Sequence, residues 1–171
     1  GGMSSAVAFL LEKRYKKIAF VCNDVSMIQM TERKRAYLEG LQKAGLKPST
    51  ELILEVPFAD NREGQTKKIQ TFLNARKPDA VLFAANYLGV QGLEAIRNLQ
   101  LKIPADIGII CFDDDELFSM YQPAITVVQQ PAQELAKTAV AILMAKLGRN
   151  DADPKESVEL EAKLIVRHST K

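Results

Sequence analysis

Short runs of apolar residues alternate along the chain with longer segments in which apolar residues recur every three or four positions. The short runs are typical of buried parallel strands, and the longer segments are typical of amphipathic helices. The pattern predicts five strands, at residues 17–23, 52–56, 80–85, 107–112 and 125–128. It predicts helices at residues 6–12, 28–46, 61–76, 88–99 and 131–147, a loop at 149–156 and an extended segment at 158–166.

The order of these elements predicts the fold class. Neighbouring parallel strands require a crossover connection, and right-handed crossovers place helices on both faces of the sheet. Regular alternation of strand and helix therefore indicates an α/β protein with an open, mostly parallel sheet and a flavodoxin-like architecture. No internal repeat or long linker divides the chain.

Composition narrows the class without naming an activity. The chain has 171 residues, 47% of them hydrophobic and 26% charged, with a formal net charge of +2. This length suits one globular domain, and near-neutral charge argues against a strong nucleic-acid-binding face within these residues. The two cysteines, Cys22 and Cys111, lie in apolar runs and are interpreted as reduced core thiols. Without a secretory signal or a membrane-spanning run, we expect a cytoplasmic protein.

Polar residues follow several of the predicted strands, where an open parallel sheet binds its ligands. Asn23 and Asp24 follow the first strand, Asn86 and Tyr87 the third, and residues 113–115, all aspartate, the fourth. These side chains offer carboxylate and amide groups, which suit a ligand rich in hydroxyls. Arg33 stands early in the following helix, and its residue type alone favours a ligand contact and a solvated position equally.

Catalytic and nucleotide-binding chemistry is not indicated. No glycine-rich phosphate loop occurs, and Gly89 and Gly92 are interpreted as a close-packing pair within a helix. The single histidine, His168, has no nucleophile motif beside it and is expected at the surface. A run of three acids is more typical of a solvated loop or a helix N-terminus than of a metal site. We therefore expect a protein that is not an enzyme and has no cofactor.

Seven short motifs in order resemble one known family. They are residues 17–21 (KIAFV), 33–37 (RKRAY), 78–86 (PDAVLFAAN), 103–108 (IPADIG), 112–114 (FDD), 123–131 (PAITVVQQP) and 164–170 (LIVRHST). Each is weak alone, but together they cover nearly the whole chain. They resemble the effector-binding domain of lactose-repressor and galactose-repressor type transcription regulators.

The resemblance implies a periplasmic-binding-protein-like sensor in which two α/β subdomains close around a sugar or a purine. It implies that Arg33, Asn86 and Asp113 bind the effector. Tyr87 stands where the family often has an aspartate; stacking on a sugar face and packing at a subunit contact are both open for it. A periplasmic sugar-binding protein of a transporter, which shares the fold, is the alternative function.

The resemblance also predicts how the chain is organised. Residues 1–171 are expected to be a partial effector-binding domain that lacks the DNA-binding helix-turn-helix and most of one subdomain. Residues 17–125 form the core subdomain, 126–150 a crossover strand and a helix of the absent subdomain, and 157–171 a return strand. The apolar positions of that helix then need another cover, such as a second copy of the chain: Leu135, Ala139, Ile142 and Leu143.

The family resemblance further implies a homodimer. Its contacts are expected from the helix after Asn86, including Gln91, and from the segment near Tyr121. Operator DNA would be bound only through the absent N-terminal domain.

Overall fold

The computed structural model describes residues 1–24, 27–147 and 158–171 of the chain. Its centre is a single sheet of six strands in the order β2-β1-β3-β4-β5-β6. The first five strands are parallel, and β6 pairs antiparallel with β5. The bounds are β1 Ile18–Asn23, β2 Ile53–Val56, β3 Ala80–Phe83, β4 Gly108–Phe112, β5 Thr126–Gln129 and β6 Lys163–Ile165. The predicted α/β class with a mostly parallel sheet is confirmed.

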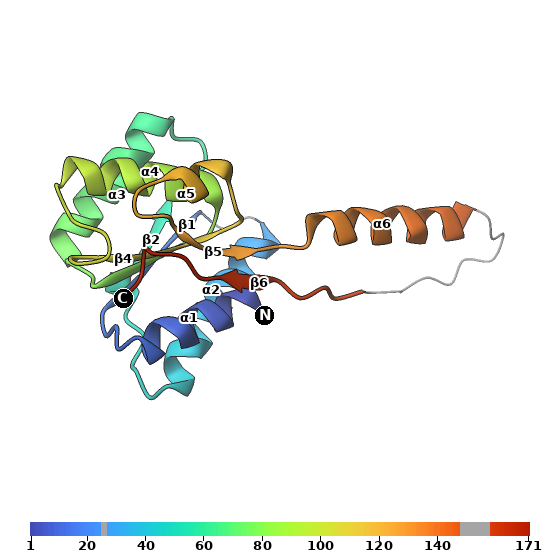
Figure 1. The fold of residues 1–171 in the computed structure, drawn as a ribbon, viewed down its shortest axis with the longest axis horizontal. Coiled ribbons are helices and arrows are strands. Elements are labelled where there is room, and N and C mark those ends of the chain that lie inside the picture. Colours follow the sequence, from blue (N-terminus) through green and yellow to red (C-terminus); the bar gives the residue numbers. More distant parts are fainter. Residues whose placement is uncertain (25–26, 148–157) are drawn as a thin grey trace.

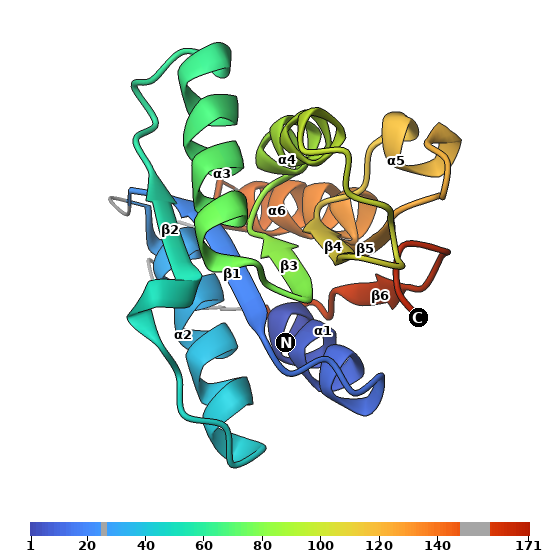
Figure 2. The same ribbon diagram turned by 90° about the vertical axis from the view of Figure 1, so that its left-hand side faces the viewer.

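Helices cover both faces of the sheet (Figures 1 and 2). On one face, α1 (Gly2–Glu12) packs against α2 (Ile28–Lys43). On the other, α3 (Arg62–Arg76) packs against α4 (Asn86–Asn98), and the short α5 (Glu116–Met120) lies beside α4. A 3-10 turn, Thr50–Leu52, leads into β2. This two-sided cover explains why β1, β3 and β4 are buried at every position.

The core joins the sheet to the helices through large apolar side chains. Tyr37 of α2 is fully buried, stacks on Phe20 with ring centroids 4.9 Å apart, and donates its hydroxyl to the Ile18 carbonyl at 2.8 Å. The buried Tyr37 hydroxyl needs this partner because an unpaired buried polar group costs folding free energy. Cys22 and Cys111 are buried and free, as expected for core thiols.

The glycine pair of α4 lies against the sheet. A Cβ atom at Gly89 would stand 2.5 Å from Cys111 Sγ, and one at Gly92 would overlap the Phe83 ring. These positions are glycine because the helix backbone approaches β3 and β4 too closely for any side chain. The sequence interpretation of a close-packing pair is confirmed.

Several element ends differ from the sequence prediction. The first helix begins at Gly2 and not at residue 6. Gly2 and Met3 are buried, and they extend the packing of this helix against the rest of the protein. The third strand ends at Phe83, and the next helix begins at Asn86, two residues earlier than expected. Helix α5 was not predicted; it is a single short turn whose N-cap, Asp115, accepts a hydrogen bond from the Leu117 amide at 2.9 Å.

The chain after β5 leaves the body. Helix α6 (Ala132–Leu147) projects to one side of the sheet (Figure 1) and has no buried residue. Most of the large apolar side chains of α6 are exposed: Leu135, Val140, Leu143, Met144 and Leu147. The predicted loop at 149–156 lies outside the described residues. Within the predicted extended segment 158–166, only Lys163–Ile165 forms a strand. Among the described residues, no helix is long and apolar enough to cross a membrane.

Candidate functional site

The polar side chains that follow the strands meet at one edge of the sheet. β1 has β2 on one side and β3 on the other, so the direction of winding reverses between β1 and β3. Ligands of open α/β sheets bind at such a reversal, beyond the carboxyl ends of the strands. We call the group at this edge the strand-end site and define it by Arg33, Phe58, Asn86, Tyr87 and Asp113.

Arg33 extends from the second turn of α2 across the ends of β3 and β4. Its Nη1 donates to the Ala84 carbonyl at 2.5 Å and lies 3.7 Å from Asp113 Oδ2. Its guanidinium carbon is 3.6 Å from the centroid of the Phe112 ring, a cation–π contact. With only 12% of its side chain exposed, Arg33 is not a solvated helix residue.

Burial makes the Arg33 charge costly. The pKa of Arg33 is lowered, chiefly because burial removes water from the guanidinium; the nearby groups of Asp113 and Tyr87 oppose the shift without cancelling it. The fold therefore holds a cation that its surroundings do not fully compensate. Such a group is a common feature of binding sites, where a ligand supplies the missing partner.

Asp113 turns its carboxylate toward Arg33 and toward the chain that follows β5. Its backbone has φ +69°, and its N–H donates to the Val128 carbonyl at 2.9 Å. Gln130 Nε2 donates to Asp113 Oδ1 at 2.5 Å. Asp113 is half-buried, so part of its carboxylate is open to a ligand.

The two acids after Asp113 have other partners. Asp114 accepts two hydrogen bonds from Arg167, and Asp115 caps α5. The described residues hold no group of three or more ligating side chains that suits a metal ion. Of the three acids, only Asp113 faces the strand-end site.

Tyr87 lies between the ends of β1 and β3. Its hydroxyl donates to Asn23 Oδ1, and its ring meets the Phe58 ring edge to face, with centroids 6.4 Å apart. Burial raises the pKa of Tyr87, and the Arg33 charge opposes that shift. Asn23 is fully buried and also donates to the Val56 carbonyl at 3.1 Å, so it supports Tyr87 and is closed to a ligand.

Asn86 begins α4 beside Tyr87. Its Oδ1 accepts the Tyr87 backbone N–H at 2.8 Å, which fixes the side chain at the start of the helix. The amide NH2 group of Asn86 is then the part suited to donate to a ligand. The structure thus places Asn86, Tyr87, Arg33 and Asp113 at one edge.

Sequence reasoning missed two members of this edge. Phe58 follows β2 and is 62% exposed, with its backbone N–H held by Asp24 Oδ1 at 2.9 Å. Gln130 entered only as part of a family motif, and its bond to Asp113 was not foreseen. For Phe58, the available signal was its place just after a strand and Pro57; nothing local to Gln130 indicated its partner.

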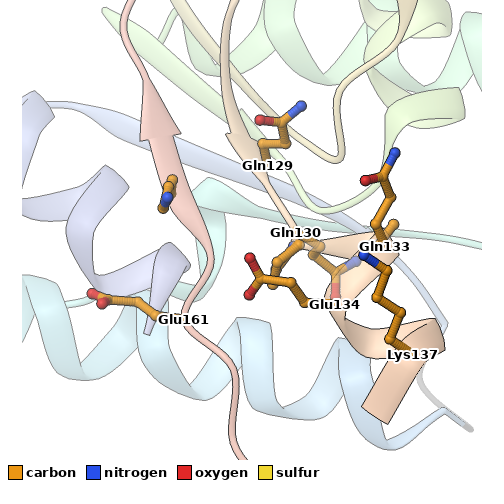
Figure 3. A pocket seen from close by; sticks show the side chains of 9 residues that line it. Gln129, Gln130, Gln133, Glu134, Lys137 and Glu161 are labelled. Atoms are coloured by element: carbon orange, nitrogen blue, oxygen red, sulfur yellow. The ribbon is translucent and has the colours of Figure 1, made fainter. Parts of the chain in front are cut away.

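A cavity of about 420 Å³ adjoins Gln130 on the α6 side. Figure 3 shows Gln129 at the end of β5, Gln130 after it, Glu134 and Lys137 on α6, and Glu161 on the chain that leads to β6. Most of its lining residues are exposed, and they come from the ends of β5 and β6, from residues next to these strands and from the first turns of α6.

The two residues expected at a subunit contact lie on the α4–α5 side. Gln91 is 6% exposed, so little of its surface is available to a partner, and its Oε1 accepts no hydrogen bond from the described residues. Tyr121 lines a hollow of about 220 Å³ with Leu117 and Val90. Met120, beside it, is 74% exposed.

Comparison with known proteins defines the family of this chain. The family model of the periplasmic binding protein-like domain matches residues 7–170. The chain belongs to that family, and within it to the effector-binding domains of LacI-family transcriptional regulators. The family predicted from the seven motifs is thereby confirmed.

Individual relatives agree with this assignment. The chain is 25% identical over 161 residues to the HTH-type transcriptional repressor PurR of Yersinia enterocolitica, covering 94% of this chain and 47% of the relative. PurR of Aliivibrio fischeri is 26% identical, with 96% and 49% covered. The chain therefore spans about half the length of these curated relatives. Both are named transcriptional repressors and not enzymes, in agreement with the sequence prediction.

Solved structures show the same fold. A complex of the transcriptional regulator CelR with cellobiose has a TM-score of 0.89 and 26% identity, covering 99% of this chain and 51% of the other. A regulatory protein of the LacI family from Chloroflexus aggregans has a TM-score of 0.87 and 25% identity, with 99% and 60% covered.

Proposed function

We propose that this chain is the small-molecule-sensing half of a bacterial transcription regulator, located in the cytoplasm. The observation that carries the proposal is the convergence of Arg33, Tyr87 and Asp113 at the strand-end edge, where the Arg33 side chain is largely buried and the Asp113 carboxylate is partly open. Effector binding shifts the affinity of a dimer for operator DNA, through differential affinity for closed and open states.

The chemistry of the site favours a ring-shaped ligand with several polar groups, a sugar or a purine. Asp113 accepts from two neighbouring hydroxyls or ring N–H groups, Arg33 donates from a planar fork, and Asn86 donates from its amide. The rings of Tyr87 and Phe58 offer an apolar wall for a ligand face. The CelR structure, a cellobiose complex, supports a sugar as the ligand, and a purine is the alternative.

The domain organisation proposed from the sequence fits this role. Residues 17–125 supply one wall of the effector cleft, residues 126–150 lead into the other half of the full-length regulator, and 157–171 return from it. The exposed apolar face of α6 supports this division, because a helix of this kind normally buries that face. Since this chain carries one wall only, we expect it to bind effector weakly or not at all.

The full-length regulator is proposed to be a homodimer that meets through the α4–α5 surface. Exposed Met120 and Leu117, beside Tyr121, support this surface, with the small exposed part of Gln91 at its edge. Light scattering of the full-length protein is expected to give twice the monomer mass. A monomer at high concentration would contradict the proposal.

Calorimetry on the full-length regulator tests the effector site. Pentoses, hexoses, cellobiose and purine bases are titrated into the wild type and into the variants Arg33→Ala and Asp113→Ala. The wild type is expected to bind one of these classes, and each variant to lose at least tenfold in affinity, because charged hydrogen bonds are worth about 1.5–3 kcal/mol. Unchanged binding in both variants would refute the assignment of these residues.

A further inference from the structure

Arg167, which the proposed function does not use, holds the residue next to the proposed ligand-binding carboxylate. Its Nη1 donates to Asp114 Oδ1 at 2.9 Å and its Nη2 to Asp114 Oδ2 at 2.7 Å. The two side chains are only 18% and 21% exposed. This paired arrangement fixes direction as well as distance, which a lysine in the same place does not do.

The Arg167 side chain is itself fixed to the sheet. Its Nη1 also donates to the Ile125 carbonyl at 3.0 Å, and its backbone N–H donates to Thr126 Oγ1 at 3.0 Å. Two residues later, the buried Ser169 donates its hydroxyl to the Ile109 carbonyl at 2.6 Å and accepts the Thr126 N–H at 2.8 Å. The segment after β6 is therefore tied to both β4 and β5, and it presents the guanidinium from a fixed place.

The backbone at Asp113 requires such support. Its φ of +69° lies in the left-handed region, which a residue with a Cβ adopts at a cost in free energy. The two successive carboxylates have different partners: Asp113 contacts Arg33 and Gln130, and Asp114 contacts Arg167. Loss of the Arg167 contact leaves Asp114 with the Asp115 N–H, which donates to its Oδ1 at 2.9 Å, but removes its tie to the sheet, so the peptide between Asp113 and Asp114 is less restrained. Rotation of that peptide moves the Asp113 carboxylate.

We infer that Arg167 is a positioning residue that holds Asp113 in its ligand-binding orientation through Asp114. The inference deepens the proposed function, because it takes Asp113 as the ligand-binding carboxylate. Arg167 comes from the last residues of the chain, directly after β6, and Gln130 comes from the segment that leads into α6. The chain that follows β5 and the chain that follows β6 thus both contact the Asp113–Asp114 turn.

Nuclear magnetic resonance on the 171-residue chain tests this without any ligand. The side-chain amide of Gln130 donates to Asp113, so its proton shifts report where the Asp113 carboxylate lies. The Asp113→Ala variant gives the shifts of a released Gln130. Arg167→Met is expected to move the Gln130 signal to the Asp113→Ala position, while Arg35→Met, which removes a surface ion-paired arginine, leaves it at the wild-type position.

Asp114→Asn serves as the second variant, because it keeps the volume of the side chain, removes the charge and replaces one of the two oxygens that accept from Arg167 with an NH2 group. Circular dichroism first shows which variants are folded, and the folded ones decide the question. A Gln130 signal at the wild-type position in the folded variants overturns the inference, because a purely structural Arg167 would lower stability without moving Asp113.

The same variants in the full-length regulator separate this inference from the proposed function. If Asp113→Ala weakens effector binding, Arg167→Met is expected to weaken it by about tenfold, the factor of one misplaced charged hydrogen bond. If Asp113→Ala leaves binding unchanged, the proposed site is wrong, whatever the Gln130 signal shows. If Asp113→Ala weakens binding and Arg167→Met does not, only the positioning role is wrong.

Discussion

Replacing Arg33 with methionine tests whether this arginine serves binding and not folding. The substitution keeps a long unbranched side chain and removes the charge. It loses the hydrogen bond to the Ala84 carbonyl, worth about 1.5–3 kcal/mol for a charged donor. It also loses the cation–π contact with Phe112, worth about 1 kcal/mol, for which a thioether–ring contact of similar size substitutes.

The opposing gain is the cost of burying the charge, which is several kcal/mol per ion. The lowered pKa of Arg33, with burial as its largest cause, shows that folding disfavours the charged form. For a base whose folded-state pKa is lowered, this penalty is fully present below that pKa and disappears only above the unfolded-state pKa, so it acts at neutral pH. The two sides nearly balance, and Arg33→Met is expected to change the unfolding free energy by less than about 1.5 kcal/mol.

Urea denaturation at pH 7, followed by circular dichroism, measures this change in the 171-residue chain. Arg35→Met on the exposed side of α2 is the matched control, since its side chain is 61% exposed. Its stability is expected to stay within about 0.5 kcal/mol of the wild type. A loss of more than about 3 kcal/mol in Arg33→Met would refute the reasoning, because it would make Arg33 a structural residue comparable to a broken buried ion pair.

Three further predictions concern packing and exposure. Gly92→Ala is expected to lower the unfolding free energy by about 1–2 kcal/mol in urea titrations, since overlap with Phe83 exceeds the gain in helix propensity; an unchanged midpoint would contradict the close packing. Burial raises the pKa of Cys22 to about 12 and that of Cys111 further, so iodoacetamide at pH 8 should modify neither thiol until urea unfolds the chain. Rapid labelling of the native chain would be the opposite result. Leu143→Lys on α6 should change stability by less than about 0.5 kcal/mol and reduce self-association in sedimentation, because the side chain is 56% exposed; a large loss of stability would mean that α6 packs in solution.

Much of the fold was predictable from local patterns. The apolar runs of β1, β3 and β4 are continuous because these strands are covered on both faces, so their length and place appear directly in the sequence. Element ends were less well predicted. Asn86 lies in a helix, although the sequence pattern predicts it in the loop after a strand. Helix α5 is too short to show a helical period.

The candidate site was predictable in position but not in membership. The rule that ligands bind beyond the carboxyl ends of parallel strands indicates Asn86, Tyr87 and Asp113 from the sequence alone. The rule made Asn23 and Asp113 equally good candidates for ligand contact. In the structure Asn23 is buried and bonded to Tyr87, whereas Asp113 is partly open. Whether a polar side chain is buried and hydrogen-bonded within the protein, or is open to a ligand, depends on residues far away in the sequence.

The sequence by itself determined the order of strands and helices, the α/β class and the edge at which a ligand would bind, because these follow from local periodicity and from the geometry of parallel sheets. Only the tertiary structure decided that Arg33 lies on Phe112, that Arg167 holds Asp114, and that α6 has no buried residue. The physical reason is that a pattern shows which face of an element is apolar or charged, while the partner of that face is set by packing between segments distant in sequence.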